Sequence, residues 1–261
     1  MNSLREDLLE LMDDTRHDPL SPEPLSAKLN RLCEFIVCEK HAQLWERWSG
    51  REDIRQSSES LRATSARALS LVEKRRAFRA YAEKRDADLY TSLLSAAVHE
   101  EGEYARIDRN ASVIFIGAGA FPLSAITIAR ETSARVLCTD IDDEAVRHGS
   151  QVARLFGLKE RFQYIDSPMS NREFLCAATH VFIASLVQEK LEVLEELTSE
   201  VRPDCKIIVR YGNGLKSLFN YPLEVSSLTS WQTTSFSRGG RIYDTLLLQP
   251  LATATAAGSI V

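Results

Sequence analysis

Hydrophobic residues recur with two different spacings along the chain, and the change comes near residue 105. Before it, apolar positions such as Leu8 and Met12 fall three or four residues apart, which is the period of an amphipathic helix. After it, short apolar runs alternate with helical stretches, which favours a parallel sheet covered on both faces. The pattern predicts a helical domain over residues 1–105, an α/β domain over 106–250 and a disordered tail over 251–261.

The predicted sheet of the second half has seven strands. Five short apolar runs, each followed by a stretch with helical spacing, are typical of parallel strands. Two further strands, at 223–228 and 241–248, leave no room for a long helix between them, so we expect an antiparallel hairpin at the end of the sheet. The five parallel strands are predicted at 112–116, 135–139, 161–165, 180–184 and 205–211.

The segment from Val113 to Arg130 has the pattern of a buried strand, a glycine turn and a helix. Gly117 and Gly119 allow a sharp turn and a close approach of the backbone to a ligand. Pro122 fits the first turn of the helix, and it takes the place of the third glycine of G-x-G-x-x-G. A pyrophosphate usually needs that glycine, so the turn predicts a nucleotide-type ligand other than NAD or FAD.

Asp140 follows the second predicted strand. It lies about twenty residues past the glycines, where a carboxylate can accept hydrogen bonds from both hydroxyls of a ribose. The turn and this aspartate together favour S-adenosylmethionine (SAM), which has no phosphate, and the Rossmann-like fold of class I SAM-dependent transferases. The alternative is an α/β domain without a ligand, in which Asp140 caps a helix.

The remaining acidic residues at this edge have competing explanations. In an open parallel sheet the ligand lies beyond the carboxyl ends of the strands. Asp166, after the third predicted strand, is a candidate partner of the adenine amino group, and capping of the next helix explains it equally well. Asp142 and Asp143 are better explained as N-cap residues than as ligand contacts.

Charge and composition exclude several classes of partner. The 261 residues carry a net charge of −5, so we expect no general nucleic-acid-binding surface, and the basic run at 72–85 is better explained as a solvated helix face. No apolar run is long enough to span a membrane, and the acidic N-terminus has no apolar signal core. These features predict a cytoplasmic protein that has no membrane partner.

Cysteine and histidine give no sign of a metal site. The five cysteines form no C-x-x-C pair, and the five histidines lack the spacing of metal ligands. We therefore expect neither a bound metal nor a disulfide framework, and we expect most of the thiols to be buried as small hydrophobic groups.

Several longer motifs resemble the nicotianamine synthase family. FIGAGAFPLSAITIA resembles the family's glycine turn with its proline- and leucine-rich continuation, and LCTDIDDEAV resembles its D-I-D segment. The stretch HVFIASLVQEKLEVLEELTSEVRPDCKIIVRYGNGLKSLFNYPLEV resembles the region of the fourth and fifth strands. In the first half, LSPEPLSAKLNRLCEFIV and LYTSLLSAAVHEE resemble two helices of the family. The resemblance covers most of residues 20–248.

This resemblance implies a transfer of the aminocarboxypropyl (aminobutyrate) arm of SAM. A primary amine attacks the γ-methylene of the methionine moiety, and methylthioadenosine leaves. The length of the chain is similar to that of the bacterial branch, whose members attach one such unit to histidine during the biosynthesis of opine-type metallophores. Histidine as the acceptor, a downstream opine dehydrogenase and a reaction without metal are what this likeness implies.

The attacking amine must lose a proton, so the resemblance also implies a carboxylate base. Alignment of the tyrosine-rich helix places the family's glutamate at Glu100. The segment after it is shorter here than in plant members, so Glu101 and Glu103 stay candidates, with His99 as a neighbour rather than a second base. The alternative is a solvated cluster at the end of a helix.

Other positions are candidates for binding. Tyr90 precedes Glu100 by ten residues on the same predicted helix, where it either shapes the substrate cavity or fills the core. Arg210 ends a strand on the ligand side and would pair with a carboxylate of methionine or of the acceptor. The remaining candidates are Ala184 and Leu186 for SAM, and Asn30 and Tyr221 for the acceptor.

Two other functions are consistent with the same scaffold. A small-molecule methyltransferase would transfer the methyl group instead and leave S-adenosylhomocysteine. A non-catalytic module would bind SAM or a metallophore without turnover. The apolar faces of the helical domain are also sufficient for a homodimer.

Overall fold

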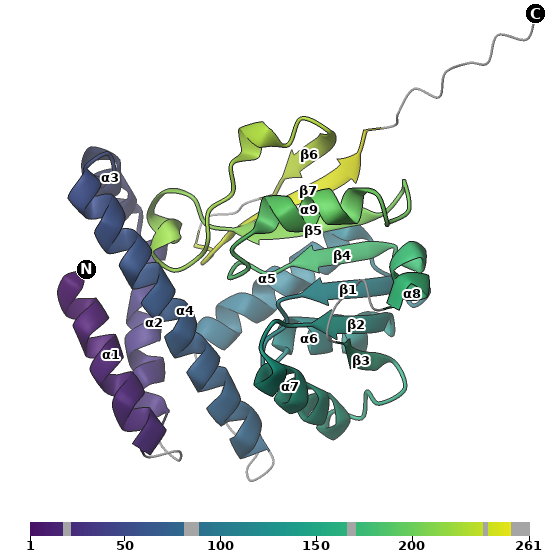
Figure 1. Cartoon of the computed structure of the whole chain (residues 1–261), viewed down its shortest axis with the longest axis horizontal. Helices are drawn as coiled ribbons and strands as arrows, with labels where there is room; N and C mark the ends of the chain where they lie inside the picture. The colour runs from purple at the N-terminus through teal and green to yellow at the C-terminus, as the bar shows by residue number, and fades with distance from the viewer. Residues whose placement is uncertain (18–21, 81–88, 166–170, 237–239, 252–261) are drawn as a thin grey trace, which may run out of the picture.

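The computed structural model has the α/β fold class predicted from the sequence, with helices in the first part and a seven-stranded, mostly parallel sheet in the second (Figure 1). It describes residues 1–17, 22–80, 89–165, 171–236 and 240–251. Asp166 and nearly all of the predicted disordered tail lie outside these residues.

The long helix α4 organises the N-terminal helices. It packs against α1, α2 and α7, and so joins the helical part to the α/β part. One stripe of α4, with Leu61, Ala68, Leu69 and Val72, is buried, as the apolar face of an amphipathic helix should be. The helices of this half are α1 (Asn2–His17), α2 (Glu23–Val37), α3 (Glu39–Trp48), α4 (Glu52–Ala80) and α5 (Leu89–Ala105).

The strands of the sheet lie in the order β3-β2-β1-β4-β5-β7-β6. The first five are parallel, and β7 runs antiparallel to both β5 and β6. The helical bundle lies beyond the carboxyl ends of the parallel strands (Figure 1). The strands are β1 (Ser112–Ile116), β2 (Arg135–Thr139), β3 (Phe162–Ile165), β4 (His180–Ile183), β5 (Lys206–Tyr211), β6 (Trp231–Ser235) and β7 (Asp244–Pro250).

The prediction of a strand at 223–228 is wrong. A 3₁₀ turn, Val225–Ser227, occupies that stretch, and the Glu224 side chain caps it by accepting a hydrogen bond from the Ser226 N–H. The strand is β6, which begins at Trp231, and its QTTS sequence is polar because it lies at the edge of the sheet and is largely exposed. An edge strand needs no apolar alternation, so the sequence pattern pointed to the wrong segment.

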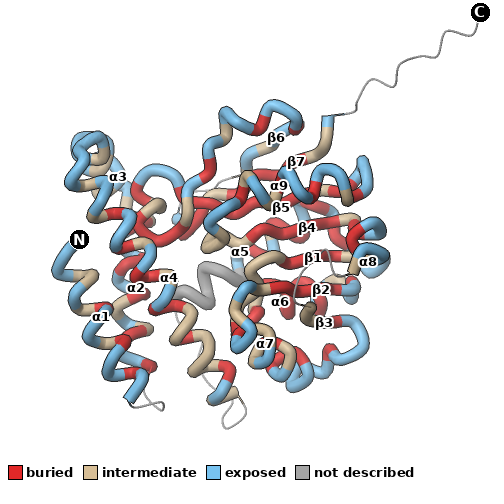
Figure 2. The backbone as a smooth tube through the Cα atoms, in the orientation of Figure 1, coloured by how far each residue is buried: buried red, intermediate tan, exposed pale blue. Residues whose placement is uncertain are grey.

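Helices cover the sheet on both faces, and each face has its own hydrophobic cluster. Buried residues of α5, α6 (Leu123–Thr132) and α7 (Asp143–Leu155) pack on one face, in a cluster that extends into α1, α2 and α4. Residues of α8 (Arg172–Ala177) and α9 (Lys190–Thr198) pack on the other. The central strands β1, β4 and β5 are buried almost throughout, whereas the helices alternate between buried and exposed positions (Figure 2). The domain boundary at residue 105 stays a prediction.

No helix in the described part of the chain combines the length and the apolar character that a bilayer span requires.

Candidate active site

The glycine turn between β1 and α6 has the backbone conformation expected of it. Gly117 and Gly119 both have φ of 76°, a region that side chains disfavour. A Cβ on Gly117 would lie 2.8 Å from Val187 Cγ2, and one on Gly119 would lie 2.4 Å from Glu73 Oε2. Pro122 stands at the N-cap of α6. The turn is therefore enclosed from two sides, by the loop after β4 and by α4.

Asp140, directly after β2, is hydrogen-bonded to this turn. Its carboxylate accepts hydrogen bonds from the Gly119 N–H at 2.8 Å and from the Asp142 N–H at 3.1 Å. Burial raises the pKa of Asp140 above its ordinary value, although these N–H groups oppose the shift. The adjacent Ile141 is fully exposed. A carboxylate and a free apolar side chain thus stand together beside the turn.

Two further contacts fix the turn. The Tyr164 hydroxyl, from β3, donates a hydrogen bond to the Gly119 carbonyl at 2.6 Å. Asp142 caps α7 by accepting from the N–H groups of Glu144 and Ala145, as the sequence predicts. These hydrogen bonds therefore fix the positions of the glycine turn, the end of β2 and the start of α7 relative to one another.

Glu73 is the residue at this site that the sequence reasoning missed. It comes from α4, and its carboxylate meets the glycine turn at Gly119 and Ala120. Burial, followed by the negative charge of Asp140, raises the pKa of Glu73 from its ordinary 4.5 to about 8, against the opposing effects of Arg76 and the Ala120 N–H. The residue as a whole keeps some exposed surface, but protein atoms surround its carboxylate. It is the acid whose pKa suits proton transfer near neutrality.

A signal for Glu73 was present in the sequence. It lies next to Val72 and four residues after Leu69, both of which belong to the buried stripe of α4. An acid beside the apolar face of a helix is unusual and merits attention. The run at 72–85 is mostly positively charged, and that charge favours a solvated helix face. Glu73 therefore does not stand out among the lysines and arginines of the run.

The three glutamates at the end of α5 have other partners. Glu101 is only 1% exposed and pairs with Arg210. Arg210 Nη2 donates a hydrogen bond to Glu101 Oε2 at 2.5 Å, and Arg210 Nε donates to both carboxylate oxygens at 3.1 Å. Glu100 forms an ion pair with Arg241, and Glu103 lies 3.6 Å from His99 on the exposed side. None of these contacts joins the glycine turn.

Arg210 belongs to a buried network that ties α5 to β5, β7 and α6. Its Nη1 donates to Ser124 Oγ at 2.9 Å, and Thr245 Oγ1 donates to Glu101 Oε1 at 2.9 Å. The guanidinium also lies over the rings of Phe182 and Tyr243. Arg210 is therefore engaged by Glu101 inside the protein, and its pairing with a substrate carboxylate stays a prediction.

The loop after β4 covers the other side of the turn. Lys190 is buried, and its ammonium donates to the carbonyl of Ser185 at 3.0 Å, to that of Tyr221 at 3.3 Å, and to that of Val187. Burial lowers the pKa of Lys190 to about 7. Ala184 lies against Gly117, which brings this part of the predicted SAM site together.

The other predicted positions come from several different elements. Leu186 packs against the larger hydrophobic cluster. The Tyr221 hydroxyl accepts from Gln188 Nε2 at 2.9 Å, and the Arg62 guanidinium of α4 lies over its ring. Asn30 lies on α2, and Tyr90 lies in the first turn of α5, where its side chain is outside the described part. Their roles stay predictions.

Within the described residues, no group of three or more histidine, cysteine, aspartate or glutamate side chains is placed to hold a metal ion.

Comparison with known proteins decides the family. A family profile described as "Nicotianamine synthase protein" matches residues 93–239. The chain belongs to the nicotianamine synthase family. This confirms the resemblance seen in the sequence motifs.

Curated members of similar sequence are bacterial. The chain is 36% identical over 227 residues to a protein of Pseudomonas aeruginosa (strain UCBPP-PA14) named "L-histidine 2-aminobutanoyltransferase", and the match covers 87% of this chain and 86% of that protein. A protein of Yersinia pestis with the same name is 30% identical over 194 residues, with 73% and 71% of the two chains covered.

The fold of the family extends over the whole chain. The crystal structure of MtNAS in complex with MTA and tNA superposes with a TM-score of 0.80 at 15% identity, covering 96% of this chain and 97% of that one. The match includes the N-terminal helices as well as the sheet, so α4 and the glycine turn belong to one shared architecture.

Proposed function

We propose that this protein transfers the 3-amino-3-carboxypropyl group of SAM to the amino group of histidine and releases methylthioadenosine. The observation that carries the proposal is the position of Glu73, an acid with a raised pKa, over the glycine turn beside Asp140. Membership of the family supports it, as do the relatives named L-histidine 2-aminobutanoyltransferase and the solved MtNAS complex with MTA.

The residues at the turn suit SAM. Gly117 and Gly119 bring the backbone close to the ligand, and the remaining lone pairs of Asp140 can accept from the ribose hydroxyls. The exposed Ile141 offers an apolar surface for the adenine. We assign no contact to Asp166, which the structure does not describe.

The transfer reaction needs one catalytic group from the protein, a base that removes a proton from the amine. The nitrogen lone pair of the acceptor forms a bond to the γ-carbon of SAM. The carbon–sulfur bond breaks, its electron pair goes to sulfur, and the sulfonium becomes the neutral thioether of methylthioadenosine. Glu73 takes the proton that the amine must lose. Its raised pKa keeps it basic enough to do so, and the positive sulfonium will favour its ionised form.

Glu73 is better placed for this step than Glu100, the residue inferred from the motif. Glu100 is ion-paired with Arg241 at the far end of α5, and Glu101 is committed to Arg210. The carboxylate of Glu73, by contrast, meets the glycine turn, and the negative charge of Asp140 contributes to its raised pKa.

Product analysis tests the proposal against its alternatives. The protein is incubated with SAM and one amino acid per reaction, which is L-histidine, D-histidine or another amino acid. The products are identified by mass spectrometry. An adduct of histidine that has gained one aminobutyrate unit, with methylthioadenosine, supports it. A methylated product with S-adenosylhomocysteine contradicts it in favour of a methyltransferase, and SAM binding without turnover favours a binding module.

Two finer parts of the proposal concern partners. The expected product keeps a primary amine, and a downstream opine dehydrogenase is the enzyme expected to use it. A homodimer is the expected assembly, with contacts through the exposed apolar side chains of α3, Leu44 and Trp48. Light scattering over a range of concentrations tests the assembly.

A further inference from the structure

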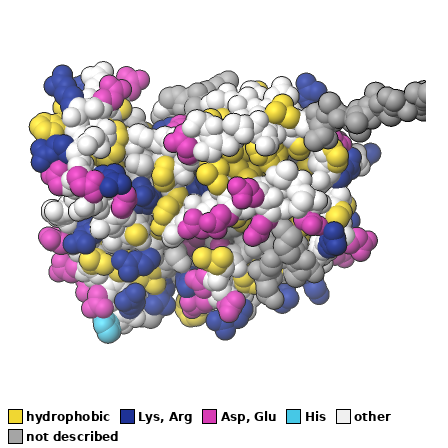
Figure 3. Space-filling model, turned by 45° about the horizontal axis from the view of Figure 1, so that its top comes forward, with side chains coloured by type: hydrophobic (Ala, Val, Ile, Leu, Met, Phe, Trp, Pro, Cys, Tyr) yellow, Lys and Arg dark blue, Asp and Glu magenta, His cyan; other side chains and the backbone are white. Residues whose placement is uncertain are grey.

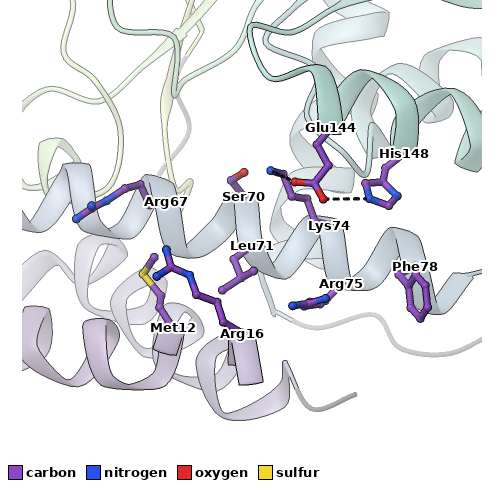
Figure 4. A pocket seen from close by; sticks show the side chains of 10 residues that line it. All are labelled: Met12, Arg16, Arg67, Ser70, Leu71, Lys74, Arg75, Phe78, Glu144 and His148. Atoms are coloured by element: carbon purple, nitrogen blue, oxygen red, sulfur yellow. Dashed lines mark hydrogen bonds and ion pairs between the residues drawn. The ribbon is translucent and has the colours of Figure 1, made fainter. Parts of the chain in front are cut away.

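A cleft separate from the glycine turn lies between α1, α4 and α7. It has a volume of about 530 Å³, within the range of small-molecule sites. Arg16 comes from α1, Arg67 and Arg75 come from α4, and His148 from α7 (Figure 4).

The cleft lies on a different side of α4 from the candidate active site. Arg67, Ser70, Lys74 and Phe78 follow one another at three- and four-residue intervals and so share one face of the helix. Glu73 is turned about 100° from Lys74 around the helix axis, and its carboxylate meets the glycine turn. The two sites are therefore neighbours that share α4 as a wall.

The arginines of this cleft lack the partners that arginines have elsewhere in the molecule. The exposed Arg51, Arg55 and Arg202 each pair with an acidic side chain. In the described part of the chain, no ion pair with a carboxylate is recorded for Arg16, Arg67 or Arg75. Figure 3 shows Lys and Arg side chains over the N-terminal helices, at the lower left, with Asp and Glu side chains among them. In a chain of net charge −5, such unpaired positive charge is an uncommon local feature.

Arg75 adds a buried donor without an acceptor. Its Nε is buried and has no hydrogen-bond partner among the described residues, and its Nη2 reaches only the Thr15 carbonyl at 3.4 Å. A buried donor that has no acceptor is costly, so the site is incomplete without an added one.

We propose that this cleft binds a small anion with two or more carboxylate or phosphate groups. Guanidinium groups hold both kinds of oxyanion through paired hydrogen bonds, and three arginines line this cavity, which is too small for a polymer. Ser70 adds a hydroxyl donor on the same wall.

Lys74 couples the cleft to the candidate active site. Its ammonium bridges Asp142 at 2.7 Å and Glu144 at 2.6 Å, and so clamps α4 to the start of α7. The N–H of Asp142 in turn donates to Asp140. An anion in the cleft competes with these two carboxylates for Lys74. It therefore loosens the clamp and weakens SAM binding, and by linkage SAM weakens anion binding to the same degree.

Calorimetric titration with citrate and with pyrophosphate, at constant ionic strength, tests the site. Arg16 and Arg67 are exposed, so the double variant Arg16→Gln/Arg67→Gln should fold normally. We expect at least one probe to bind the unaltered protein, and this variant to weaken binding about tenfold or more, as the loss of charge-assisted bonds implies. The preferred probe decides between carboxylate and phosphate.

Matched control variants distinguish binding in this cleft from nonspecific attraction of anions to positive charge. The variant Arg51→Gln/Arg202→Gln removes the same charge from paired, exposed positions and should leave binding unchanged. Ser70→Asp puts a negative charge into the cleft and should abolish binding. Absence of binding by both probes, or equal losses in the cleft and control variants, overturns the proposal.

The coupling has its own readout and rests on the SAM binding of the proposed function. The dissociation constant of SAM is measured with and without the bound anion, and that of the anion with and without SAM. Equal factors above one support the coupling, and factors of one contradict it. Failure of SAM to bind contradicts the proposed function alone, because the direct titration does not depend on it.

Discussion

The molecule buries two glutamates in opposite ways. Glu101 is enclosed with Arg210 and Thr245, which satisfy both of its oxygens. Glu73 is enclosed beside Asp140, a second acid, and Arg76 only partly offsets that repulsion. A cation partner occupies the oxygens of a buried carboxylate, whereas burial beside a second acid raises the pKa of Glu73 towards neutral pH. The first arrangement stabilises a fold, and the second is suited to proton transfer.

The largest expected effect is on turnover in Glu73→Gln. We expect the rate to fall about 10³-fold, since a positioned general base contributes roughly that much. SAM binding, measured by calorimetry, should persist, because the turn and Asp140 are unchanged. Glu100→Gln is the matched control, and it should keep most of the activity. A Glu73→Gln protein of normal rate, with an inactive Glu100→Gln protein, would reverse the assignment.

Breaking the buried pair should have the next largest effect, on stability. Arg210→Met leaves the Glu101 carboxylate without its cation, and we expect the free energy of unfolding to fall by about 3 kcal/mol. Urea denaturation measures it. Arg202→Ala, which breaks an exposed pair with Asp204, should cost less than about 1 kcal/mol. Equal losses in both variants would mean that Glu101 does not depend on Arg210.

The pH dependence of stability should report the raised pKa of Glu73. The pKa of Glu73 is raised in the folded state, so its favourable contribution is complete below about pH 4.5 and is lost as the pH rises through about 8. Relative to Glu73→Gln, the unaltered protein should therefore lose about 2 kcal/mol between pH 5 and pH 8, a value reduced for partial exposure. Denaturation of both proteins across this range measures the difference, and parallel curves would count against the raised pKa.

The smallest expected effect is on stability, when the Thr245 hydrogen bond to Glu101 is removed. Thr245→Val removes one hydrogen bond to Glu101 while Arg210 stays in place, so we expect a loss of about 1 kcal/mol. Thermal denaturation should detect it without any change in the dissociation constant of SAM. A loss as large as that of Arg210→Met would place the hydroxyl, rather than the cation, at the centre of the network.

Local patterns predicted the scaffold of the site and missed its long-range pairings. The buried run of β1, the glycines after it and Asp140 after β2 each leave a mark within a few residues, and all were placed correctly. Whether Arg210 meets a substrate or Glu101 depends on a contact across 109 residues, which one sequence does not display. The approach of Glu73 to Gly119 is likewise a tertiary fact, set by how α4 crosses the sheet edge.

The continuous hydrophobic cluster restricts how substrates enter. Leu29 and Val72 of the N-terminal helices belong to the same apolar interior as Phe115 and Ile208 of the sheet. Swinging the bundle away as a rigid lid would expose that interior to water, at a cost proportional to the apolar area uncovered. Exchange of substrate and product must therefore rely on rotations of side chains and short loops around α4. Scanning calorimetry should accordingly record one melting event for the entire polypeptide.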